Sequence, residues 1–302
     1  MEVTRPVAVD DGTQPPGDRS GWSALPRRRS RRGIRLLAIR TPISRPARLL
    51  LISASILIPV LFWLVVSFAR LANPAFAESF GVTETFLPPP WAVWSAGVEM
   101  AQSGQLFTDA WASIQRVLLG FGLAVLVSVP LGIIMGSLAA GRALFEPLIG
   151  LLRYLPASAF IPLLLIWLGI GEGSKVALLF IGTVFFNTLM TADAVRLVPG
   201  DLIEVSYTLG ARRTEVLRKV IVPHALPGMI DAIRVNAAAA WNFVVVAELL
   251  AAEEGLGYRI IRSQRFLQTD RIFAILVVIG LIGLTIDIAL RLLRDRIGKW
   301  CP

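Results

Sequence analysis

Long uncharged stretches between charged residues are the dominant pattern along the chain. About 20 apolar residues at a rise of about 1.5 Å per residue cross a hydrocarbon core of about 30 Å, so each stretch predicts a membrane-spanning helix. The predicted spans are 49–69, 117–140, 154–171, 176–192, 229–250 and 272–290. The sequence therefore predicts an all-α integral membrane protein with six transmembrane helices.

The second predicted span is an uninterrupted uncharged run, whereas the third is broken by prolines. The third is interrupted by Pro156 and Pro162, and the apolar stretch 145–152 before it either extends the helix or lies at the membrane surface. The second is an unbroken uncharged run that carries Gly132 and Gly136, a GxxxG spacing at which another helix backbone can approach closely. We expect a tight helix contact at this glycine pair.

Composition excludes several classes of protein. Of the 302 residues, 55% are hydrophobic and 17% charged, and the mean hydropathy is +0.67, which leaves too little polar surface for a water-soluble domain. Cys301 is the only cysteine and His224 the only histidine. We therefore expect no intrachain disulfide, no multi-cysteine zinc site, no His-containing catalytic triad and no His-pair metal site within one chain. We predict no catalytic residue and no metal site.

The formal charge of +9 is concentrated in the N-terminal segment 1–48, which carries 11 Arg against four acidic residues. We interpret this segment as a largely disordered basic tail, because it has too little apolar surface to offset the entropy of ordering. Beside a hydrophobic span, such charge indicates the cytoplasmic side and anionic lipid rather than nucleic acid. With the N-terminus placed in the cytoplasm, the inner segments carry 21 basic residues and the outer segments six. Because basic residues collect on the cytoplasmic side, this distribution predicts that both termini are cytoplasmic.

Two outer segments complete this topology. Segment 70–111 is interpreted as periplasmic, and its run of Pro88, Pro89 and Pro90 is expected to exclude a regular helix there. The segment is too small for a receptor domain, so a solute must be captured by another protein or inside the bundle. Segment 259–271 holds four of the six outer basic residues, against the general balance, and indicates an amphipathic or partly re-entrant element.

The longest predicted inner loop, 196–228, has a helical pattern of its own. Its apolar residues Leu202, Val205 and Leu209 recur at helical spacing, and a second such pattern begins after Gly210. Because glycine interrupts a helix, this pattern predicts two short helices joined at that position. They are expected to lie beneath the bundle.

The spacing in this loop resembles the EAA loop of ATP-binding-cassette (ABC) importer permeases. Glu204 is followed six residues later by Gly210, and Pro223 closes a Val-Ile-Val-Pro run further on. Val205 and Ser206 stand where that family has alanines. The resemblance implies a type I ABC importer permease bundle, with a transmembrane core over 112–295.

Further motifs are similar to those of the nitrate, sulfonate, taurine and bicarbonate branch. They include Gly-Ala-Arg-Arg at 210–213, and Ala-Glu at 247–248 followed by Gly-Leu-Gly-Tyr at 255–258. The resemblance covers roughly 108–300. It implies a transport subunit of a bacterial inner membrane, not an enzyme, with a small anion such as a sulfonate, taurine or nitrate as cargo. A pyrimidine or vitamin-precursor cargo stays open.

The same resemblance implies partners and a coupling site. The 196–228 loop is expected to dock on an ATPase subunit that binds ATP and Mg²⁺, with two such subunits serving two permeases, as a homodimer or a pair of similar chains. A periplasmic or lipid-anchored binding protein is expected to deliver the solute. This chain has no phosphate loop ending in Gly-Lys-Ser/Thr, so no cofactor is expected in it. The residues implied in ATPase coupling are Glu204, Val205, Ser206, Gly210, Ala211, Arg212 and Pro223.

Two other interpretations stay open from the sequence. A basic amphipathic loop resting on anionic lipid accounts for Arg212 and Arg213, but not for the offsets of Gly210 and Pro223. A self-sufficient secondary carrier or channel needs facing carboxylates in mid-membrane and inverted repeats, and we find neither pattern in the sequence.

Polar residues inside predicted spans are candidates for the solute path. Arg234 and Glu248 lie about 21 Å apart along one helix, so they cannot pair with each other, and each either snorkels to an interface or lines the path. The three asparagines in these spans either form hydrogen bonds between helices or contact the solute, and Trp241 either packs against other helices or recognises the solute. The candidates are Asn187, Asn236, Trp241, Asn242 and Glu248.

Overall fold

The computed structural model describes residues 43–73 and 86–298, and within these ranges the regular structure is entirely helical. The predicted basic tail lies outside the described residues up to position 42, and so does the stretch 74–85 of the outer segment. The chain divides into two compact units, Met1–Val60 and Leu61–Pro302. The predicted all-α class is confirmed for the part of the chain that is described.

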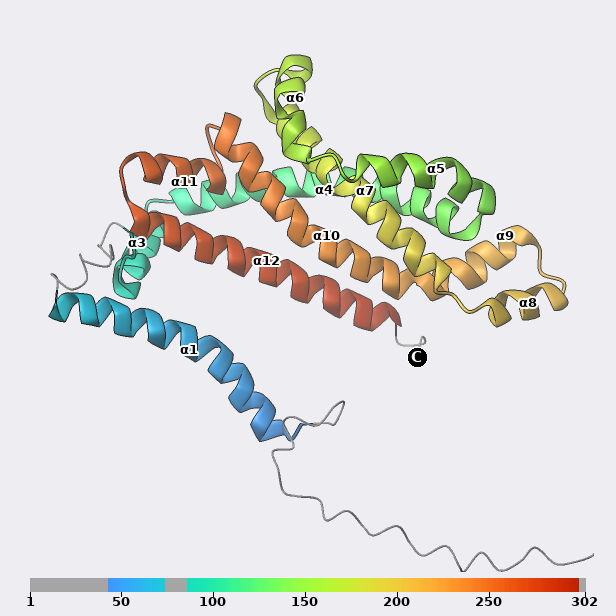
Figure 1. Ribbon diagram of the computed structural model, residues 1–302, viewed down its shortest axis with the longest axis horizontal. Helices are drawn as coiled ribbons and strands as arrows, with labels where there is room; N and C mark the ends of the chain where they lie inside the picture. The colour runs from blue at the N-terminus through green and yellow to red at the C-terminus, as the bar shows by residue number, and fades with distance from the viewer. Residues whose placement is uncertain (1–42, 74–85, 299–302) are drawn as a thin grey trace, which may run out of the picture. The chain divides into compact units, whose positions relative to one another are not determined.

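Helix α1 (Arg45–Ala72) contains the first predicted span and belongs partly to each unit. The second unit contains the remaining helices, which are labelled in Figure 1. They are α3 (Pro90–Gln102), α4 (Gln105–Ser137), α5 (Ala139–Leu152), a 3-10 turn (Ala157–Phe160), α6 (Ile161–Leu168), α7 (Glu172–Arg196), α8 (Gly200–Thr208), α9 (Arg213–Glu215), a π-helical turn (Val216–Ile221), α10 (Val222–Ala251), α11 (Leu256–Arg265) and α12 (Thr269–Ile297).

Five described helices are long and apolar enough to cross a membrane. They are α1, α4, α7, the continuous stretch from α9 through α10, and α12. A sixth crossing is available as a broken pair, α5 with residues 157–168, whose two parts are bent by 81°. The number of possible crossings is therefore five or six, in agreement with the predicted fold of about six transmembrane helices.

The third predicted span, 154–171, is wrong as a single helix. Pro156 is extended, with φ −61° and ψ 120°, and Pro162 lies in the first turn of a new helix. Proline cannot continue a helix but fits its first turn, so the two prolines divide the stretch. Helix α6 has eight residues, about 12 Å, which is too short to cross a bilayer by itself.

The outer segment also differs from the prediction, because it contains regular helix. Helix α3 begins at Pro90, where the ring fixes a helical φ and the missing N–H costs no hydrogen bond, while Pro89 remains extended. Gly104, with φ +75°, separates α3 from α4. Because α4 begins at Gln105, it extends well beyond the predicted span 117–140 at its N-terminal end.

Close packing of α4 on α7 forms the centre of the second unit. Gly120, Gly132 and Gly136 lie on the contacting face of α4, and a Cβ added to any of them comes within 2.6–2.7 Å of a Cβ on α7. The absence of a side chain therefore allows the two backbones to approach, as expected for the glycine pair. Helix α7 packs in turn on α10, and α10 on α12 (Figure 1).

Candidate functional site

The 196–228 loop forms two short helices joined by a glycine, as the sequence predicts. Gly210 follows α8 with φ +84°. Its amide donates to the carbonyl of Tyr207 at 2.9 Å, and the amide of Ala211 donates to the carbonyl of Ser206 at 3.0 Å. This paired arrangement is the Schellman closure of a helix, which requires the left-handed backbone that glycine adopts most easily. A Cβ at Gly210 has no atom within 4 Å, so backbone conformation rather than space restricts the position.

Helix α8 exposes apolar side chains. Val205 is 57% exposed and Leu209 82% exposed. Glu204 lies in the middle of α8 and is also exposed. Helix α8 packs on the rest of the described chain through the half-buried Ile203, whereas the apolar residues noted in the sequence leave an apolar surface on the other side of the helix.

The second half of the loop is anchored in the bundle. The amide of Arg212 donates to the Glu215 carboxylate at 3.0 Å and caps α9. The π-helical turn leads directly into α10, with Pro223 in its first turn. Val216 and Ile221 are buried in a core that also contains residues of α7. The residues predicted for coupling all lie between α8 and the first turn of α10: Glu204, Val205, Ser206, Gly210, Ala211, Arg212 and Pro223.

The path candidates fall into different environments. Asn187 on α7 donates to Ser128 Oγ on α4 at 2.5 Å, and Asn236 on α10 donates to Asn187 Oδ1 at 3.4 Å. These two amides are thus interhelical hydrogen-bonding groups. Trp241 is buried, and its indole N–H has no partner among the described residues. Asn242 is exposed on α10.

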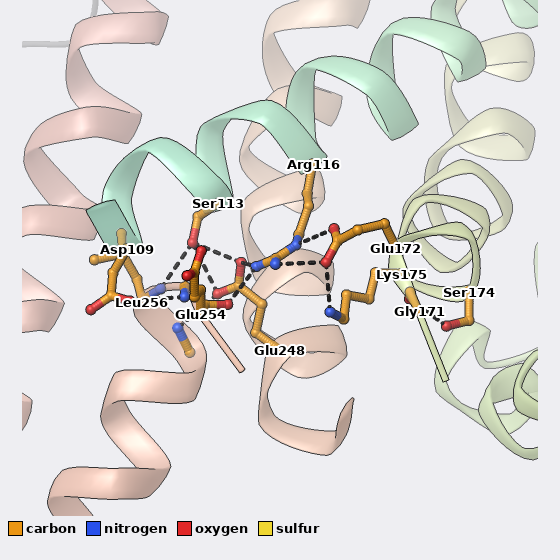
Figure 2. Close-up of polar contacts among 12 residues, drawn as sticks. Asp109, Ser113, Arg116, Gly171, Glu172, Ser174, Lys175, Glu248, Glu254 and Leu256 are labelled. Atoms are coloured by element: carbon orange, nitrogen blue, oxygen red, sulfur yellow. Dashed lines mark hydrogen bonds and ion pairs between the residues drawn. The ribbon is translucent and has the colours of Figure 1, made fainter. Parts of the chain in front are cut away.

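Glu248 belongs to a buried polar cluster, shown in Figure 2. Only 1% of the residue is exposed, so it does not snorkel to an interface. Its carboxylate accepts from Ser113 Oγ at 2.7 and 2.9 Å, from Arg116 Nη1 at 2.7 Å and from the Gly257 amide at 2.8 Å. Arg116 also forms two hydrogen bonds to the carboxylate of Glu172, at 2.6 and 2.8 Å. The cluster joins the N-terminal turns of α4 and α7 to the C-terminal end of α10.

Sequence reasoning missed Asp109, Ser113 and Arg116, because the predicted second span begins beyond all three. Their spacing of four and three residues places them on one face of a helix, and this was the available signal. In Figure 2 they point from α4 toward the residues of α10 and the start of α11. Asp109 accepts from the Gly255 amide at 3.0 Å and pairs with Arg259 Nε at 2.6 Å.

Arg234 lies in a second charged network between α10 and α12. Its guanidinium pairs with Asp231 at 3.2 Å and with Asp287 at 2.9 Å, and Arg294 pairs with Asp231 at 2.9 Å. Arg234 thus has its own partners, and the prediction that it does not pair with Glu248 holds. Within the described residues, no group of His, Cys, Asp and Glu side chains could hold a metal ion.

Comparisons with known proteins identify this helical arrangement. The family described as binding-protein-dependent transport system inner membrane component matches residues 128–299, which include the 196–228 loop and α7 through α12. The chain belongs to this family. The taurine transport system permease protein TauC of Escherichia coli K12 is 35% identical over 272 residues, 88% of this chain and 94% of the relative. The riboflavin transport system permease protein RibX of Chloroflexus aurantiacus is 31% identical over 220 residues, 73% of this chain and 82% of the relative.

A solved structure also shares the fold. The inward-facing methionine ABC transporter MetNI contains a chain that matches with a TM-score of 0.58 and 20% identity, covering 65% of this chain and 98% of that chain. Family membership makes this protein a membrane-embedded permease subunit of an ABC importer, and a transport subunit rather than an enzyme. The family works with ATPase and solute-binding partners. The individual coupling and path residues remain predictions.

Proposed function

We propose that the 196–228 loop is the docking site for the ATPase subunit, and that the chain imports a small anion of the sulfonate or taurine type. The observation that carries the docking site is the apolar surface of α8, at one end of the second unit (Figure 1): Val205 is 57% exposed on the helix, and Leu209, which directly follows it, is 82% exposed. Exposed apolar side chains on a polar loop favour burial against another protein. Gly210 sets the direction of α8 relative to α9.

In this proposal the ATPase subunit supplies ATP binding and hydrolysis, and this chain transmits the resulting movement. ATP and Mg²⁺ bind the ATPase, because the sequence of this chain supplies no phosphate loop. Two ATPase subunits close on each other and displace two permeases, each through its own 196–228 loop. Helix α10 is a single helix of 30 residues, about 45 Å, that begins where the loop ends. A displacement of the loop therefore reaches the far end of the bundle through one element.

We further propose that a second permease copy packs on the face formed by α7 and α10. A groove of about 450 Å³ lies on this face and is lined by Met190, Asp193, His224 and Val235, among others. Asn242 is exposed on α10, and an exposed amide within an apolar span favours protein or water over lipid. These features support a homodimer whose solute path runs beside α10, with the exposed Asn242 as the path candidate on this helix, whereas Trp241 packs in the core of the chain.

The cargo class follows from relatives. The 35%-identical relative of Escherichia coli is named for taurine, and it matches 88% of this chain. The riboflavin-named relative, at 31% identity, favours the vitamin-type alternative. We propose taurine and related sulfonates as the cargo, delivered by an external binding protein to a permease in the bacterial inner membrane. Uptake of radiolabelled taurine, with riboflavin and nitrate as competitors, tests this choice.

The docking proposal is tested at Gly210. A Gly210→Glu change forces a side chain into the left-handed region, at a cost of about 1–2 kcal/mol, and turns α8 away from its position. We expect the variant to insert in the membrane but to lose co-purification with the ATPase subunit and to lose uptake. Glu204→Ala, which removes an exposed charge on the same helix, is expected to reduce both partially.

Gly210→Asn is the matched control, because asparagine tolerates left-handed backbone better than other residues with a Cβ. It is expected to keep more than half of the ATPase association. Full uptake by a stably inserted Gly210→Glu variant would refute the docking site. Equal losses with asparagine and glutamate would show that the backbone argument is wrong.

A further inference from the structure

Three consecutive backbone amides at the start of α11 are held by side chains from other helices. The amide of Gly255 donates to Asp109 Oδ1 at 3.0 Å, and that of Leu256 to Ser113 Oγ at 2.9 Å. The amide of Gly257 donates to Glu248 Oε2 at 2.8 Å. The first amides of a helix have no partner within it, so these side chains take the place of a local cap. The start of α11 is thereby fixed to α4 and α10.

The two glycines of this turn are explained by the cluster. Gly255 has φ +125°, and a Cβ there meets Glu248 Cδ at 2.5 Å and Arg116 Nη1 at 2.6 Å. A Cβ on Gly257 meets the carbonyl oxygen of Val245 at 2.7 Å. The absence of side chains at the two glycines of the Gly-Leu-Gly motif therefore leaves space for the Glu248 carboxylate and the Arg116 guanidinium to lie directly against the backbone.

The cluster joins α4, α10 and α11 through buried charges, and it reaches α7 through Glu172, whose side chain is 60% exposed. The side chain of Glu248 is fully buried, and that of Arg116 is 7% exposed. Arg116 also donates to the carbonyl of Glu254 at 2.7 Å, in the connection between α10 and α11, and to Glu172 at the start of α7. Buried charges that lose a partner are costly, so this group resists separation of α10 from α4 and α11.

Glu248 stands at the opposite end of α10 from the 196–228 loop. Position 248 lies about 39 Å along α10 from Val222, where the helix emerges from the π-helical turn. The described part of α10 is continuous between these points. One end of a single helix thus meets the proposed ATPase-docking loop, and its other end contacts α4, α7 and α11.

We propose that Glu248 is a positioning residue for transport: it fixes the outer end of α10 to α4 and α11, so that ATPase-driven displacement of the 196–228 loop reaches α11. This inference rests on the docking function proposed above. Glu248 touches no solute in this role. It acts through Ser113, Arg116 and the Gly257 amide.

The test compares movement at the two ends of α10. Permease assembled with its ATPase subunits is placed in nanodiscs, in a Cys301→Ser background, with a single reporter introduced as Gln264→Cys on α11 or Thr214→Cys on α9. Both positions are exposed. Maleimide reaction rates are measured without nucleotide and after vanadate trapping with ATP. In the otherwise unchanged protein, both rates are expected to change at least threefold on trapping.

Glu248→Gln is expected to keep the change at Thr214 and to lose it at Gln264. Glu253→Gln is the matched control, because it removes the same charge from an exposed residue in the connection between α10 and α11. This variant is expected to keep the rate changes at both reporters. If the Glu248→Gln variant fails to assemble with the ATPase subunits, the same measurement is made on Asp109→Asn, because Asp109 accepts the hydrogen bond of the Gly255 amide. It is expected to reduce the change at Gln264 by more than half.

Other outcomes overturn the proposal. An unchanged rate at Gln264 in the parent protein means that α11 does not follow the loop. A normal response at Gln264 in the Glu248→Gln or Asp109→Asn variant means that the cluster does not transmit the movement. Loss of response at both reporters means that Glu248 only maintains the fold. Failure of the docking proposal is seen separately, as loss of ATPase from the parent complex or its retention by Gly210→Glu.

Discussion

At the scale of single residues, Glu248 and Asn187 show that polar side chains in apolar helices find hydrogen-bond partners on other helices. Glu248 lies against Ser113 and Arg116, and Asn187 against Ser128, in each case on another helix. Because lipid offers no hydrogen bonds, a polar group in a span is satisfied by protein or by a water-filled path. For Asn187, the observed partner favours the interhelical hydrogen bond over solute contact.

A Ser128→Ala change tests this assignment of Asn187. Ser128 is fully buried and accepts from Asn187 Nδ2 at 2.5 Å. Its removal leaves that N–H without its interhelical acceptor, at a cost of about 1 kcal/mol in the free energy of unfolding. We expect a lower thermal midpoint with an unchanged KM for uptake. Ser95→Ala on the exposed face of α3 serves as the control and is expected to leave the midpoint unchanged. A raised KM with an unchanged midpoint would assign Asn187 to the solute path instead.

At the scale of helices, the packing of α4 on α7 depends on residues without side chains. A Cβ on Gly120 meets Leu179 Cβ at 2.7 Å and the Val176 carbonyl oxygen at 2.8 Å, whereas a Cβ on Gly122 has nothing within 4 Å. Two glycines on one helix therefore have opposite surroundings. Only the contacting face of α4 requires glycine.

Alanine substitution at these two positions separates packing from helix propensity. Gly120→Ala is expected to lower the stability by about 1–3 kcal/mol, because backbone atoms of α7 cannot move aside without shifting the helix. Gly122→Ala is expected to leave the stability unchanged or raise it by up to about 1 kcal/mol, through better helix propensity. Thermal or denaturant unfolding of the purified protein measures both. Equal effects of the two changes would contradict the packing argument.

For the whole molecule, the predicted topology rests on the distribution of Lys and Arg, and the structure gives partners to two of the residues in the segment that opposes the general balance. Of the four basic residues between 259 and 271, Arg259 pairs with Asp109 at 2.6 Å and Arg271 pairs with Glu99 at 2.9 Å. These two ion pairs join α11 to α4 and α12 to α3. Because the positive-inside rule counts Lys and Arg rather than net charge, these ion pairs leave the count unchanged, and the orientation with both termini in the cytoplasm stays a prediction.

Cysteine labelling tests this orientation in intact cells. Cysteines introduced as Ser30→Cys and Thr214→Cys, in a Cys301→Ser background, are expected to react only when the reagent enters the cytoplasm. Gly81→Cys is expected to react from outside. Positions 30 and 81 lie outside the described residues, so their assignment rests on the distribution of basic residues and the number of spans. Outside labelling at Thr214 would reverse both the orientation and the coupling role of the 196–228 loop.

The sequence by itself determined the features that depend on neighbouring residues. Uncharged length predicted the helices and the membrane, and the interruption of helical spacing predicted Gly210 as a joint. Both features arise within a few turns of one helix, so periodicity and glycine chemistry suffice to find them. The family resemblance of the 196–228 loop was visible for the same reason.

Only the tertiary structure decided the features that join distant parts of the chain. Ser113 and Glu248 are separated by 135 positions, so no local pattern could show that the carboxylate is buried against α4 rather than snorkelling. The broken third span and the helix that begins at Pro90 depend on whether a proline interrupts a helix or starts one, and local sequence permits both. Packing makes that choice, because each backbone amide and each buried charge must find a partner within the folded chain.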